Sequence, residues 1–147
     1  MRKFVWRLER VLEIRKMQEQ KARSDLIVLT EKLAVARGEL LVQKKILENI
    51  IRDLAGLGNR RRLAEQEFFM TNSAASDEKI KRLEEKVKEL EFRQKQKISE
   101  VLKLRIAKEG MEKLRAQAKE EYIKEQEKIE QTELDEEARV LFVRNHD

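Results

Sequence analysis

The side chains that could take part in catalysis in this chain are almost all carboxylates. The sequence holds 29 aspartates and glutamates, one histidine and no cysteine. General acid–base catalysis needs a carboxyl group whose pKa is raised inside a cleft, whereas these carboxylates recur along highly charged, helical segments that face solvent. The histidine, His146, is the second-to-last residue, where chain ends are usually poorly ordered. We therefore expect no enzymatic activity.

The sequence also lacks the residues that usually hold a metal ion or a phosphate group. A zinc site needs several clustered histidines or cysteines, and the chain has no such set. The stretch AGLGNRRR contains Gly56 and Gly58 but not the Lys-Ser/Thr that completes a phosphate-binding loop. Its arginines, Arg60–Arg62, form either a phosphate-binding patch or a solvated helix face. We favour the solvated face for these arginines, because no aromatic residues are interleaved with them for base stacking. From the whole set of missing residues we expect no metal and no cofactor.

Candidate partner-binding residues gather at the two ends of the chain and near its middle. Phe4 and Trp6 open the sequence although aromatic residues make up only 5 % of it, and the apolar stretch VLFV, residues 140–143, lies near the other end. Such ends either cap one another or insert into an apolar opening of a partner. Phe68 and Phe69 either close the core near a turn or form a docking spot.

Long helices must position these residues, because 43 % of the chain is charged, 40 % is hydrophobic and proline is absent. Apolar residues recur in alternating steps of three and four from Val5 to Leu57, which is the a/d seam of a coiled coil. Three polar residues interrupt it: Arg15, Glu19 and Gln43. A second seam starts at Ile80 in a different phase and is expected to stutter after Leu104. Its further residues are Leu83, Val87, Leu90, Val101, Leu104, Met111, Leu114, Ala118, Tyr122 and Ile129.

We predict an all-α fold in which two long helices form an antiparallel coiled-coil hairpin, with residues 1–147 as a single domain. The expected helices lie at about 3–70 and 77–144, joined by a turn at about 71–76. The favoured turn is a run of small polar residues followed by Asp77, a suitable start for a helix. The alternative turn is at 56–59, since each glycine there costs a helix about 1 kcal/mol.

The charge distribution agrees with a hairpin of two nearly equal helices. Residues 2–23 carry eight basic and three acidic side chains, and residues 119–137 carry nine acidic side chains and three lysines. A fold-back of equal helices places these two segments side by side. Each exposed pair contributes only about 0–1 kcal/mol, but the set would specify register and direction. The net charge of +5 also permits nucleic acid as a partner.

The two ends resemble a known family. KFVWRLERVLEIRKMQEQKA is similar to the opening of the FliJ family of flagellar type III export proteins, with an aromatic and basic start followed by Leu-Glu and then Leu and Arg at helical spacing. IKEQEKIEQTELDEEARVLFVR is similar to the family's acidic closing stretch. The resemblance covers the whole chain and implies an antiparallel coiled coil like the central stalk of rotary ATPases, with a role in flagellum biogenesis, protein transport and, through the flagellum, chemotaxis.

The resemblance further implies partners and contact residues. It implies that the paired termini enter the hexameric flagellar export ATPase, and that the protein contacts the transmembrane export gate and escorts export chaperones. The residues expected to face the ATPase ring are Phe4, Trp6, Arg7, Leu8, Leu12, Arg15, Leu134, Asp135, Glu136 and Phe142. Phe68 and Phe69 are assigned to the export gate without a matching motif.

The expected location is cytoplasmic, at the flagellar base and peripheral to the inner face of the cell membrane. No apolar run approaches the roughly 20 residues of a membrane span, and Glu9 and Glu13 interrupt the stretch where a signal peptide needs an apolar core. Two alternatives remain open. One is a coiled-coil arm that binds nucleic acid, and the other is a generic tether or a stalk subunit of another rotary ATPase.

Overall fold

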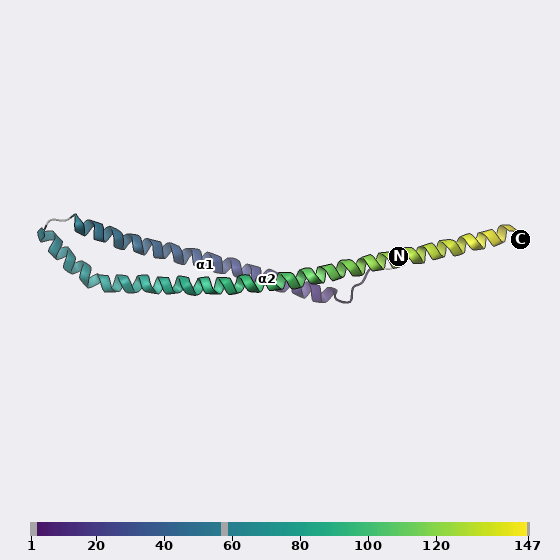
Figure 1. Ribbon diagram of the computed structural model, residues 1–147, viewed down its shortest axis with the longest axis horizontal. Coiled ribbons are helices and arrows are strands. Elements are labelled where there is room, and N and C mark those ends of the chain that lie inside the picture. The colour runs from purple at the N-terminus through teal and green to yellow at the C-terminus, as the bar shows by residue number, and fades with distance from the viewer. Residues whose placement is uncertain (1–2, 57–58, 147) are drawn as a thin grey trace. The chain divides into compact units, whose positions relative to one another are not determined.

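The protein consists of two helices. The computed structural model describes the backbone of residues 3–56 and 59–146, with their side chains except at 59–62, 69, 71–73 and 146. Helix α1 spans Glu9–Ala55 and helix α2 spans Asn59–His146 (Figure 1). All regular secondary structure in the described residues is helical. The predicted all-α helical hairpin is therefore confirmed.

The chain divides into two compact units, each described by itself below. The central unit comprises Lys21–Val101, and the terminal unit comprises Met1–Gln20 together with Leu102–Asp147. Each unit contains part of α1 packed against part of α2. Whether residues 1–147 act as one domain stays a prediction.

The core of the central unit is a heptad seam between the two helices. It is built from buried Leu33 and Ala36 of α1 and Val87 and Leu90 of α2, with Leu29 and Leu40 packed against them. Leu33 is only 1 % exposed. A leucine seam with alanine in it brings the helix axes close and fills the space between them, which is how a coiled coil buries its apolar stripe. The predicted seam of α1 is thus confirmed at these positions.

Ion pairs on either side of this seam establish the direction of the helices. Arg37 Nη2 lies 3.0 Å from Glu91 Oε1, and Lys44 Nζ lies 3.4 Å from Glu84 Oε1. As the residue numbers rise along α1, those of the facing residues fall along α2, so the helices are antiparallel. These groups are about half exposed, so each pair adds only about 0–1 kcal/mol.

The break between the helices lies at the glycines and not at the polar run. Helix α1 ends at Ala55, where the N–H of Gly56 donates to the carbonyl of Asp53 at 3.2 Å in a tightened last turn. Residues 71–76 lie inside α2, which corrects the favoured turn and the predicted helices at 3–70 and 77–144. The physical reason is that residues 71–76 include two alanines and no glycine or proline, so small polar side chains alone do not stop the helix.

Helix α1 also begins later than predicted. Residues 3–8 are not helical, and the first helical turn forms when the N–H of Leu12 donates to the carbonyl of Leu8 at 3.0 Å. Val5, expected on the seam, is 83 % exposed. Its assignment to the seam is wrong, because the seam of α1 in the terminal unit starts only once the backbone has become helical.

Two cations continue the seam of α2 in the terminal unit. Lys108 and Arg115 are half-buried at the three–four spacing, whereas Leu114, expected on the seam, is 51 % exposed. Lys108 Nζ lies 3.8 Å from Glu19 Oε2, and Arg115 Nε lies 2.7 Å from Glu9 Oε2. The three–four spacing stays regular from Leu104 to Tyr122, where charged residues occupy seam positions and pair with acids on α1. The two successive steps of four from Ala118 to Tyr122 and from Tyr122 to Gln126 form a stutter further along α2.

Two helical glycines offer a direct test of helix propensity. A Cβ atom added at Gly38 of the central unit or at Gly110 of the terminal unit meets no atom within 4 Å. We expect Gly38→Ala and Gly110→Ala each to raise the free energy of unfolding by about 1 kcal/mol, because alanine loses less backbone entropy in a helix. Urea unfolding followed by circular dichroism measures this change, and a loss of stability in either variant would contradict the open surroundings of that glycine.

Candidate partner-binding site

The first part of the candidate site is the N-terminal segment of the terminal unit, residues 3–8. The ring of Phe4 lies 5.4 Å from that of Tyr122 at an interplanar angle of 51°. The guanidinium carbon of Arg115 lies 5.6 Å from the centroid of the Phe4 ring, a distance suited to a cation–π contact. Phe4 is half-buried as a result. This aromatic residue therefore anchors the N-terminal segment to α2.

The remaining predicted residues of this segment divide into packed and exposed side chains. Trp6 and Leu8 are half-buried, and Leu12 is only 1 % exposed. Arg7 and Arg15 are exposed. Leu12 thus contributes to the packing of its own chain, and the surface that a partner would meet here carries arginines.

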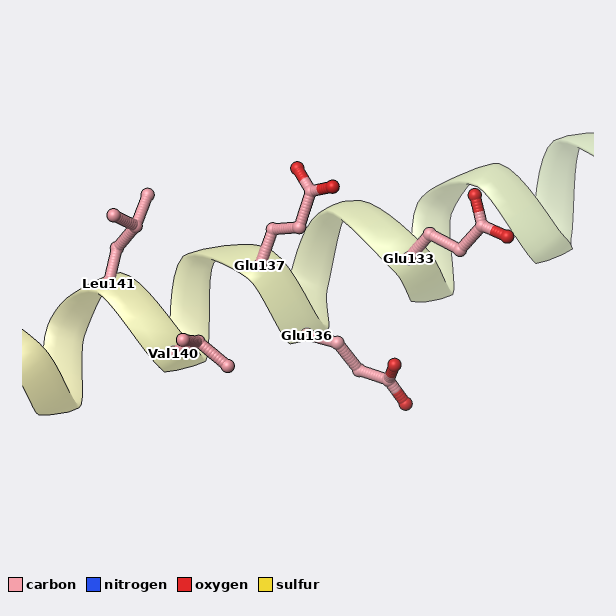
Figure 2. A pocket seen from close by; sticks show the side chains of 5 residues that line it. All are labelled: Glu133, Glu136, Glu137, Val140 and Leu141. Atoms are coloured by element: carbon pink, nitrogen blue, oxygen red, sulfur yellow. The ribbon is translucent and has the colours of Figure 1, made fainter.

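The second part of the candidate site is the outer segment of α2, residues 127–145. Every residue in this segment is exposed. Large apolar side chains lie among acidic ones, with exposed fractions between 54 and 62 % at Leu134, Val140, Leu141, Phe142 and Val143. Exposed apolar residues gathered over a short stretch mark an interaction surface. Figure 2 shows Glu133, Glu136 and Glu137 projecting from the helix, with Val140 and Leu141 further along it.

The structure does not bring the two parts together as predicted. Phe4 packs on Tyr122, and Leu134 and Phe142 are 59 % and 62 % exposed. The exposure of the apolar side chains near the other end argues against mutual capping of the two ends. The reason is the register, because a break at residue 56 rather than at 71–76 moves the start of the chain back along α2.

The predicted charge pairing is corrected for the same reason. The basic stretch 2–23 was expected beside the acidic stretch 119–137. In the ion pairs of the terminal unit described above, the acids Glu9 and Glu19 belong to α1, and the cations Lys108 and Arg115 belong to α2. The acidic side chains at 127–137 are all exposed, which leaves their charge available at the surface.

The residues assigned to the export gate and to phosphate binding receive less support from the structure. Phe68 of α2 is 69 % exposed in the central unit. The side chains of Phe69 and of Arg60–Arg62 lie outside the described residues. The assignment of Phe68 and Phe69 to the gate stays a prediction.

Among the residues that the structure describes, no group of three or more metal-binding side chains is close enough together to hold an ion. The hydrogen bond from Lys97 to Glu100 raises the pKa of Lys97 above its usual 10.5 despite partial desolvation, and Asp25 adds to the effect. That lysine therefore stays charged and bridges α1 and α2 in the central unit. No helix of the described chain is long and apolar enough to cross a membrane.

Sequence reasoning missed three residues that organise the site: Lys108, Arg115 and Tyr122. Tyr122 was assigned to the seam but not to the contact with Phe4. Lys108 and Arg115 are charged and were therefore not recognised as seam residues. They nevertheless keep the three–four spacing of the half-buried residues around them. A search of the seam for cations facing acids on the other helix would have found both.

Comparison with known protein families gives one match over nearly the whole chain. The family model described as Flagellar FliJ protein matches residues 3–147. No curated protein and no solved structure gives a significant match.

Proposed function

The chain belongs to the FliJ family and is therefore a component of the flagellar export apparatus, and we propose that it binds the ring of the export ATPase like a central stalk. The family consists of non-catalytic components, so the chain would act by contact. In this proposal the N-terminal segment and the outer segment of α2 both contact the ring. The protein couples the ring to the export gate and escorts export chaperones.

The observation that carries this proposal is the exposure of the outer segment of α2. Leu134, Val140 and Leu141 are each more than half exposed in a stretch that has no buried residue. Water-exposed apolar side chains gain little from the helix that carries them, whereas burial against a partner recovers about 25 cal/mol for each Å² covered. This segment is thus suited to a protein partner.

The proposed location follows from the partners. We place the protein on the cytoplasmic side of the flagellar base, associated with the membrane only through the gate. Phe68, exposed in the central unit, is the candidate contact for the gate.

The decisive experiment measures ATP hydrolysis by the export ATPase with and without the full chain. A stalk that contacts the ring is expected to raise the rate in a saturable manner. An unchanged rate at concentrations where the two proteins demonstrably bind would exclude the stalk role, and the absence of binding would exclude the partner.

The aromatic N-terminal segment provides a sharper test. We expect the double variant Phe4→Ala/Trp6→Ala to bind the ATPase at least about tenfold more weakly, because aromatic residues dominate binding surfaces and Phe4 holds this segment against α2. Helicity should be nearly unchanged, since residues 3–8 precede α1. Binding is measured by calorimetry and helicity by circular dichroism.

A matched control for this variant is Val11→Ala. Val11 is 40 % exposed in the first turns of α1 and lies outside the candidate contacts. Its replacement should leave ATPase binding within about twofold of the wild type. Equal binding by the aromatic double variant and by this control would remove the N-terminal segment from the interface.

A further inference from the structure

The coiled-coil seam of α2 extends beyond the part that α1 covers. In the terminal unit, half-buried residues of α2 follow one another at the seam spacing: Lys108, Met111, Arg115, Ala118, Tyr122 and Gln126. Phe4 of the N-terminal segment packs on Tyr122. Continuing from Gln126 in steps of three and four gives five more seam residues, all of them exposed: Ile129, Glu133, Glu136, Val140 and Val143. We call these five residues the outer seam.

The outer seam combines an apolar stripe with two carboxylates. Ile129, Val140 and Val143 are 44 %, 57 % and 54 % exposed. Between them, Glu133 and Glu136 project from the helix and line a pocket together with Glu137, Val140 and Leu141 (Figure 2). A helix laid along this stripe would bury the apolar side chains and would also cover both carboxylates.

The same unit shows how this protein accommodates a carboxylate on a seam. Glu19 of α1 is only 3 % exposed and is paired with the seam cation Lys108, with 3.8 Å between Nζ and Oε2. The seam cation Arg115 is paired with Glu9 at 2.7 Å. A buried carboxylate without a cation is strongly unfavourable. Any helix that covers Glu133 and Glu136 must therefore supply basic side chains opposite them.

These charges also argue against a second copy of this chain as the occupant. Two outer seams packed on each other would bring Glu133 and Glu136 of both copies into the same interface. Like charges at facing seam positions repel, and coiled coils use such repulsion to reject wrong partners. The occupant is therefore a different protein.

We propose that the outer seam binds one helix of a partner protein, which continues the coiled coil and places lysine or arginine between apolar residues, opposite Glu133 and Glu136. The assignment rests on continuity with the α1–α2 seam and on charge complementarity. It deepens the proposed function and rests on it in one respect, namely that the partner belongs to the export machinery.

Two synthetic peptides test the chemistry of the outer seam. Both are amphipathic helices with leucine at their seam positions, and they differ only at two central seam positions, which carry lysine in one peptide and glutamate in the other. Calorimetry with the full-length chain should show that the lysine peptide binds at least about tenfold more tightly. The charge-reversed variant Glu133→Lys/Glu136→Lys should prefer the glutamate peptide.

The matched control reverses two charges elsewhere on the same helix. Glu109 and Glu120 are exposed, lie off the seam and lie outside the outer segment of α2, so Glu109→Lys/Glu120→Lys changes the net charge equally but should keep the preference for the lysine peptide. Circular dichroism confirms that each variant remains helical. Equal binding of the two peptides, or binding of neither, overturns the proposal.

ATPase assays separate this proposal from the proposed function. If the wild type stimulates the export ATPase but binds the two peptides equally, this proposal is overturned, while the stalk function stands. If the wild type gives no stimulation but the peptides discriminate as expected, the stalk function fails and the seam chemistry is supported.

Discussion

Replacing Leu33 by alanine is expected to lower the free energy of unfolding of the central unit by about 2–5 kcal/mol. Leu33 is 1 % exposed and packs with Ala36 of α1 and with Val87 and Leu90 of α2. The truncation removes apolar contacts and leaves a cavity between two helices that have no third layer to fill it. Because small folded units are stable by only about 5–15 kcal/mol, the pairing of α1 and α2 should be largely lost under mild denaturing conditions.

Urea unfolding followed by circular dichroism measures this effect. Leu41→Ala is the matched control, since Leu41 lies on the same helix and is 68 % exposed. The control should change the free energy of unfolding by no more than about 0.5 kcal/mol. If the two variants were equally stable, the seam containing Leu33 would not be the core of the central unit.

The second large effect is expected in the terminal unit, from Lys108→Met. This change removes the lysine paired with Glu19, whose carboxylate is almost completely buried. Removing one partner of a buried ion pair costs up to about 3–5 kcal/mol, because the remaining carboxylate stays desolvated and loses the attraction of that cation. We expect a loss of stability of this order, measured by urea unfolding at neutral pH.

The double variant Glu19→Met/Lys108→Met shows whether the cost comes from the loss of the Lys108–Glu19 pair. Replacing both partners with apolar residues of similar size is often neutral or stabilising, so this variant should recover most of the stability lost in the single variant. Lys113→Met, at an exposed lysine of the same helix, controls for the loss of a positive charge. A Lys108→Met variant as stable as this control would show that Glu19 does not depend on Lys108.

These two results bear on the proposed function in different ways. Leu33 stabilises the central unit, where the seam is apolar. Glu19 and Lys108 lie in the terminal unit, which also carries the N-terminal segment and the outer seam. A loss of ATPase binding in Lys108→Met, reversed in the double variant, would therefore link the register of the terminal unit to partner binding.

Local patterns in the sequence determined that the chain forms two long helices. The three–four spacing of apolar residues, the absence of proline and the high charge all act within a few helical turns, so they are visible without knowing what lies opposite. The pattern correctly placed Leu33, Ala36, Val87 and Leu90 on the seam. The resemblance of the two ends to the FliJ family agrees with the family match over residues 3–147.

Only the tertiary structure decided the register of the helices and the composition of the site. The helices are interrupted between Ala55 and Asn59 and not at residues 71–76. The position of this break determined that Phe4 packs on Tyr122. Lys108 and Arg115 became seam residues through acids that lie far away in the sequence. The physical reason is that helix periodicity is a local property, whereas the burial of a charge depends on its partner across the interface. In this register the outer segment of α2, with its apolar and acidic side chains, remains exposed.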